Sequence, residues 1–121
     1  MSIKLFDSEF KVMEVIWQEG DLPAKKIAEI LGAQIGWNKN TSYTVIKKCV
    51  EKGAIERIEP HFVCRALISK EDAQAFEVDE LVNKVFDGSE GLLFASLMNR
   101  GKITVDVLEN LKSLVATEGG K

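Results

Sequence analysis

The chain has 121 residues, of which 45% are hydrophobic and 29% are charged, with 16 Lys and Arg against 19 Asp and Glu. This is the profile of a soluble globular protein with one ordinary domain, or a small domain with an appendage. Its apolar runs are too short for a membrane span and its N-terminus lacks a signal-peptide core, so we expect a cytoplasmic protein.

The chain begins with a predicted helix and a short link. Apolar side chains at helical spacing predict a helix over residues 7–18, capped by Asp7 or Ser8 and ended by Gly20. Residues 21–23 follow as an extended link, because their proline suits the start of a helix better than its interior.

Two further helices are predicted before Gly53. The second runs from residue 24 to about residue 31, and Gly32 and Gly36 indicate a looser turn after it. The third ends at Gly53 and is amphipathic. Its predicted buried stripe consists of Ser42, Val45, Ile46, Cys49 and Val50.

The opposite face of the third helix carries hydroxyls, an amide and two cations, with only Glu51 against them. Lysines bind phosphates, and Asn, Thr and Ser reach base edges in the major groove. This face therefore predicts a DNA-recognition helix, although an ordinary solvated helix face can have the same composition. The candidate DNA contacts are Asn40, Thr41, Thr44, Lys47 and Lys48.

After Gly53 the pattern changes to strands. Residues 54–59 and 62–68 predict a β-hairpin joined by Pro60 and His61, with Phe62 inside the second strand. Pro-His is not a favoured hairpin dipeptide. His61, the sole histidine, is expected to be exposed at the hairpin tip, where it could touch a phosphate.

The two cysteines favour a structural role. Cys49 lies on the buried stripe and Cys64 lies in a predicted strand, which is typical of small buried residues in a reducing compartment. A zinc site needs more Cys and His at close spacing. We therefore expect no metal and no cofactor.

The last third predicts three more helices, over residues 70–86 and 90–99 and after Thr104. Their broad apolar faces need a cover. A second copy of the chain is the favoured cover, and folding back onto residues 1–68 is the alternative. The candidate dimerisation residues are Phe76, Leu81, Val85, Leu93, Leu97, Leu108, Leu111 and Val115.

The charge is distributed unevenly. Residues 1–68 hold ten basic and nine acidic side chains, whereas residues 69–121 hold six and ten. Residues 39–65 contain three acidic side chains and six basic ones, which are Lys39, Lys47, Lys48, Lys52, Arg57 and Arg65. The mild basic excess coincides with the predicted recognition helix.

Three helices and a hairpin, with a basic third helix, are the plan of a winged helix-turn-helix. The predicted fold is mainly α with a small β-hairpin. A winged-helix DNA-binding domain is expected over residues 1–69 and a helical dimerisation domain over residues 70–121. A dimer of this kind matches a palindromic operator.

Three stretches resemble a known family. They are F-K-V-M-E-V-I-W at 10–17, N-T-S-Y-T-V-I-K-K-C-V-E-K-G-A-I-E-R at 40–57 and D-E-L-V-N-K-V-F-D-G at 79–88. They are similar to the penicillinase-repressor family, which includes the methicillin-resistance repressor and copper-responsive relatives. The resemblance implies a dimeric repressor on a palindromic operator upstream of a resistance or transport operon. It places DNA contacts at the five positions above, flanked by Lys39 and Tyr43.

The resemblance also implies release from DNA when a membrane-anchored sensor metalloprotease detects a β-lactam and the repressor is cleaved. Members of that kind are cut at an Asn-Phe bond, whereas the matching place here is A-S-L-M at 95–98. The possible cleavage region is therefore Ser96 and Leu97. The paired C-x-C motifs of copper-responsive members are absent, which excludes copper sensing by that route.

The sequence favours two other classes of function less. A winged-helix module that binds another protein and no DNA is the alternative, because the sequence pI is about 5.2. An enzyme is not expected, because the sequence has no glycine-rich phosphate loop, no metal-spaced histidines and no nucleophile with a plausible base.

Overall fold

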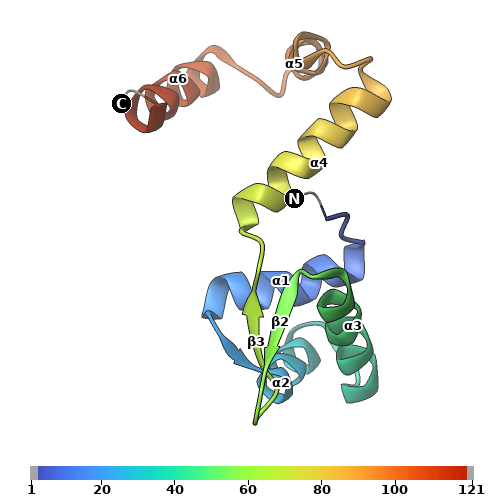
Figure 1. Cartoon of the computed structure of the whole chain (residues 1–121). Coiled ribbons are helices and arrows are strands. Elements are labelled where there is room, and N and C mark those ends of the chain that lie inside the picture. Colours follow the sequence, from blue (N-terminus) through green and yellow to red (C-terminus); the bar gives the residue numbers. More distant parts are fainter. Residues whose placement is uncertain (1–2, 120–121) are drawn as a thin grey trace. The chain divides into compact units, whose positions relative to one another are not determined.

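The structure is a computed structural model that describes residues 3–119, with side chains to residue 115. It has six helices and a three-stranded sheet in the described part, which confirms the predicted mainly α class and adds one strand to the predicted hairpin (Figure 1). Contacts divide the chain into two compact units, residues 1–78 and 79–121. The expected domain division at residue 69 stays a prediction.

The first helix, α1 (Asp7–Glu19), begins at Asp7, and its N-cap lies one residue before the expected caps. Its N-cap is Phe6, whose backbone N–H donates to Glu9 Oε1 at 2.7 Å. The glutamate at the third helical position thus satisfies the N–H of the N-cap residue itself, and Asp7 and Ser8 lie inside the helix instead of capping it. The helix ends at Gly20, as predicted.

The second helix, α2 (Ala24–Ile35), is longer than predicted. It passes through Gly32 and ends at Gly36, which has a φ of 75°. A Cβ at Gly32 would lie 3.4 Å from the backbone oxygen of Trp37, so a small residue suits this crowded position. Gly32 was wrongly interpreted as a break, because a glycine inside a helix costs only about 1 kcal/mol and does not by itself end it.

The third helix, α3 (Lys39–Lys52), ends where it was predicted to end. Asn38 caps it by accepting the backbone N–H of Thr41 at 2.8 Å. Gly53 ends it in the left-handed region, with a φ of 85°. Ser42, Val45, Ile46 and Cys49 are buried, and Val50 is half-buried.

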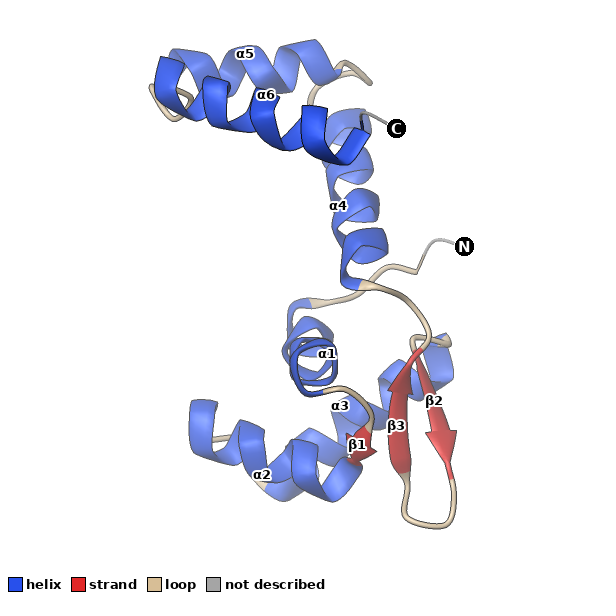
Figure 2. Ribbon diagram, turned by 90° about the vertical axis from the view of Figure 1, so that its left-hand side faces the viewer, coloured by secondary structure: helices blue, strands red, loops and turns tan. Residues whose placement is uncertain are grey.

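The sheet has the order β1-β3-β2 and is antiparallel, with β1 (Leu22–Pro23), β2 (Ile55–Ile58) and β3 (Val63–Ala66) (Figure 2). The link at residues 21–23 was not predicted to pair with a strand. Two residues carry too little alternation to reveal a strand, and the pairing of Leu22 with Cys64 is a long-range contact.

The hairpin turn is wider than predicted. Ile58 pairs with Val63, so residues 59–62 form the connection instead of two residues. Phe62 was placed in the second strand, but it lies in the turn with a φ of 51°. Pro-His lacks the residues that a tight two-residue hairpin turn demands, so a longer turn forms.

The core of the first unit lies among α1, α2, α3 and the sheet. Trp17 closes its edge by donating its Nε1–H to the carbonyl oxygen of Ile68 at 3.0 Å. The fully buried large side chains are Met13, Ile27, Leu31, Ile46, Ile55, Glu9, Val12, Cys49, Cys64 and Ser42. This packing fixes the orientation of α3.

The remaining helices are α4 (Lys70–Val85), α5 (Glu90–Asn99) and α6 (Val105–Gly119), close to their predicted bounds. Hydroxyls of Ser69, Ser89 and Thr104 cap them by accepting the backbone N–H three residues later. None of the residues of α5 is buried. In the part of the chain that is described, no helix has the length and apolarity to cross a membrane.

Candidate nucleic-acid interface

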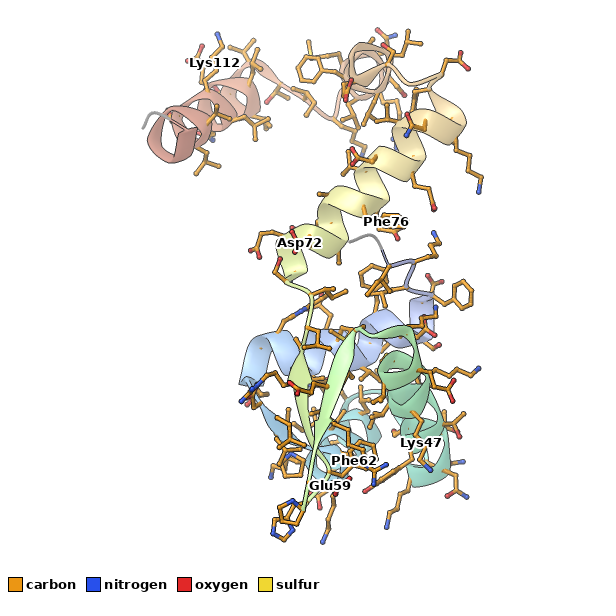
Figure 3. The ribbon with its side chains drawn as sticks, in the orientation of Figure 1. Lys47, Glu59, Phe62, Asp72, Phe76 and Lys112 are labelled. Carbon is orange, nitrogen blue, oxygen red and sulfur yellow. The ribbon has the colours of Figure 1, made fainter. Side chains whose placement is uncertain are left out.

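The outer face of α3 is open. All five side chains predicted to contact DNA (Asn40, Thr41, Thr44, Lys47 and Lys48) are exposed, while the opposite side of the helix is anchored in the core. Figure 3 shows Lys47 on α3, and Glu59 and Phe62 at the turn end of the hairpin. The helix therefore presents hydroxyl, amide and ammonium groups along one side.

The N-terminus of α3 adds to this face. Asn38 fixes the first turn, where Asn40 and Thr41 lie. Backbone N–H groups and the helix dipole make this end electropositive, which favours an anion such as a phosphate.

A row of stacked side chains ties the hairpin to α3. The Lys39 Nζ lies 5.8 Å from the Tyr43 ring centroid, and the Tyr43 ring meets the Phe62 ring edge-on at 6.1 Å. The Arg57 Cζ lies 3.7 Å from the Phe62 ring centroid. The carbonyl oxygen of Phe62 also accepts the backbone N–H of Ala24 at 2.9 Å. This aromatic row holds the hairpin turn beside the first turns of α2 and α3.

Lys52 is a structural residue, although its charge was counted in the basic excess. Its Nζ donates to Glu9 Oε1 at 2.6 Å and to the backbone oxygen of Lys4 at 2.7 Å, and lies 4.0 Å from the Phe6 ring centroid. Glu9 is 1% exposed. Lys52 thus neutralises a buried carboxylate and is not free for a phosphate.

Arg65 is also paired with carboxylates of its own chain. Its Nε donates to Asp21 Oδ2 at 2.9 Å, and its Nη1 lies 3.9 Å from Glu56 Oε1. The hydrogen bond with Asp21 raises the pKa of Arg65. Among the described residues, the cations of this region without a carboxylate partner are Lys39, Lys47 and Lys48.

The sequence missed two residues of this surface as site residues, Arg57 and Phe62. Arg57 lies two residues after the buried Ile55, so the period of a strand places both on the same side of β2. A charged residue at such a position was the signal in the sequence that could have identified Arg57. Phe62 could not be found, because it was placed in a strand. His61 is exposed in the turn, at the expected place, and Tyr43 is half-buried.

The candidate dimerisation residues differ in exposure. Leu81, Val85, Leu111 and Val115 are exposed. Phe76, Leu93, Leu97 and Leu108 are half-buried. An apolar groove is lined by Phe94, Leu108, Leu111, Lys112 and Val115. The possible cleavage residues Ser96 and Leu97 are half-buried within α5.

The cysteines are free and buried, as expected. Burial raises the pKa of Cys49 to about 12, and Glu9 adds to the rise. Burial likewise raises the pKa of Cys64 to about 11. Both thiols are therefore protonated and unreactive at neutral pH. No group of three or more potential metal-ligating side chains occurs within the described residues.

The chain is similar to known repressors over nearly its whole length. The model of the penicillinase repressor family matches residues 5–117. The methicillin resistance regulatory proteins MecI of Mammaliicoccus sciuri and of Staphylococcus aureus strain N315 are each 25% identical to it over 114 residues, which cover 93% of this chain and 93% of each relative.

Proposed function

The chain belongs to the penicillinase repressor family, and we propose that it is a sequence-specific DNA-binding repressor that acts as a homodimer on a palindromic operator. It is not an enzyme. The observation that carries the proposal is the open face of α3 beside a hairpin that the aromatic row holds in place.

In this proposal α3 enters the major groove. Lys47 and Lys48 bind phosphates, while Asn40, Thr41 and Thr44 reach base edges. Lys39 at the start of α3 and His61 in the hairpin turn add contacts to the phosphate backbone of the DNA. The unpaired lysines support this assignment, because a phosphate does not have to displace a carboxylate from them.

The homodimer is proposed to form through α4, α5 and α6. Exposed apolar side chains on these helices and the groove at Phe94 and Leu111 support it, because water contact with such surface is unfavourable. A two-fold dimer would read two half-sites separated by about one helical turn of DNA or a multiple of it. Sedimentation at micromolar concentration tests this, and a monomer there would contradict it.

We further propose that a signal relieves repression, with proteolysis by a membrane-anchored sensor metalloprotease as the candidate route. A cut at Ser96 or Leu97 would separate the apolar side chains of α6 from the rest of the chain. Immunoblotting of cells that carry a neighbouring metalloprotease gene tests this route. A chain that stays intact while its operon is induced would contradict it.

The DNA-binding proposal is tested by fluorescence anisotropy with the chain's own promoter region and a scrambled duplex of the same length. Specific binding well below about 1 μM at moderate salt is expected, because non-specific binding is weaker than that. Equal binding to both duplexes would contradict sequence specificity. Binding to neither duplex below about 1 μM would favour the alternative of a winged-helix module that binds a protein partner and no DNA.

A further inference from the structure

On the hairpin, the Arg57 guanidinium is held between a ring and a carboxylate. Its Cζ lies 3.7 Å from the Phe62 ring centroid. Its Nε donates a hydrogen bond to Glu59 Oε2, two residues further along the chain. Arg57 is 45% exposed and Glu59 is 55% exposed. This surface pair therefore lies where a ligand can reach it.

The guanidinium retains unused donors. Glu59 takes only the Nε–H, and no other acceptor in the described part of the chain is bonded to Nη1 or Nη2 of Arg57. The contact with the Phe62 ring positions the group without using its N–H donors. A planar fork with free donors matches the geometry of a phosphate.

Phe62 is itself fixed at three points. Its carbonyl oxygen accepts the Ala24 N–H at 2.9 Å, its ring contacts Tyr43, and its backbone has a φ of 51°. The ring therefore has a fixed position, in contact with Tyr43 of α3 and with Arg57. The position of the guanidinium relative to α3 follows from these contacts.

We propose that Arg57 is a DNA phosphate contact of the hairpin, that Phe62 is its positioning residue, and that Glu59 is a built-in counter-ion that weakens DNA binding. This inference rests on the proposed function. A phosphate that engages Arg57 approaches the Glu59 carboxylate, so repulsion or displacement of Glu59 opposes each binding event. The chain thereby limits its own affinity.

The central test is the affinity of the full-length Glu59→Gln protein for promoter DNA. Glutamine keeps an acceptor for the Arg57 Nε–H and removes the charge. We expect binding to tighten about two- to fivefold, the equivalent of one exposed ion pair. Glu56→Gln is the matched control, because Glu56 lies on the same strand as Arg57, is 50% exposed, and contacts Arg65 instead.

Arg57→Gln completes a double-mutant cycle. It should weaken binding and lower the salt slope by about 0.9, the loss of one phosphate contact. In that background Glu59→Gln should have no more effect than Glu56→Gln. Phe62→Leu should remove the coupling between positions 57 and 59, and Phe62→Tyr should restore it, since tyrosine retains the ring.

The outcomes separate this inference from the function on which it rests. If the parent binds the promoter specifically but Glu59→Gln tightens binding no more than Glu56→Gln does, only this inference is overturned. An unchanged salt slope in Arg57→Gln would overturn it as well. If the parent fails to bind promoter DNA, the proposed function and this inference are both wrong.

Discussion

Replacing Lys52 with methionine should destabilise the protein more than replacing its partner Glu9 with glutamine. The two residues join the end of α3 to the start of α1, with Lys52 Nζ 2.6 Å from Glu9 Oε1. Methionine keeps most of the apolar stem of Lys52 but removes its charge. Glutamine keeps the shape of Glu9 and an acceptor for the Phe6 N–H.

The magnitudes follow from burial. The Glu9 side chain is 1% exposed and that of Lys52 is 28% exposed. Lys52→Met leaves a buried carboxylate without a cation, which costs about 3 kcal/mol, the lower end of the range for a broken buried pair. Glu9→Gln leaves a cation that reaches water and retains the Lys4 carbonyl, so about 1 kcal/mol is expected. The double variant should be more stable than Lys52→Met alone, because no uncompensated charge remains.

Urea denaturation at pH 7 measures these changes at a fixed protein concentration, because association would add a concentration-dependent contribution. Lys26→Met and Glu29→Gln are the matched controls, since that pair lies 3.9 Å apart with side chains 62% and 56% exposed. Each control should change the free energy of unfolding by about 0.5 kcal/mol or less. A Lys52→Met variant as stable as the parent would refute the reasoning.

Three further predictions concern α3 and the core. Asn40→Ala or Thr44→Ala should reduce the preference for the operator over a scrambled duplex, by about 1–3 kcal/mol per lost base contact, as competition titrations can measure; an unchanged preference would exclude that residue from base contact. Gly53→Ala should lower the free energy of unfolding in urea by about 1–2 kcal/mol, because only the φ of 85° opposes the methyl group, with nothing within 4 Å of it; no loss would contradict this. The pKa values of Cys49 and Cys64 are raised in the folded chain, so above pH 9.0 the unfolded chain loses thiol protons that the folded chain keeps. The contribution of these two protonated thiols to the free energy of unfolding is therefore fully present below pH 9.0, and it is lost as pH rises through about 11 and 12. Urea titrations from pH 8 to about 11 should therefore show that the free energy of unfolding falls less steeply with pH in Cys49→Ala/Cys64→Ala than in the parent. An equal fall in both proteins would contradict the raised thiol pKa values.

The helices could be predicted because their signals are local. The stripe of α3 repeats at helical spacing, Gly53 supplies the stop, and Ser69 and Thr104 cap the following helices through their own hydroxyls. Similar local logic placed the outward residues of α3. Knowledge of one buried face is enough to assign the other.

Features that depend on distant partners could not be predicted. The pairing of Leu22 with Cys64 and the burial of Glu9 against Lys52 join segments that lie far apart in the sequence. Phe62 is a residue type that favours strands, but it lies in a turn, where its ring packs on Tyr43 of α3. The surface beside α3 therefore emerged only with the fold, including which cations are already paired.

The DNA-binding proposal depends most on Lys47 and Lys48, which would bind phosphates from the open face of α3. Its most direct test is the salt dependence of promoter binding by Lys47→Ala/Lys48→Ala beside Lys11→Ala/Lys102→Ala, which removes the same charge at two exposed sites outside α3. We expect the first variant to lower the slope of log K against log salt by about two units and the second to leave the slope nearly unchanged. Equal slopes in the parent and the first variant would contradict the assignment of α3 as the recognition helix.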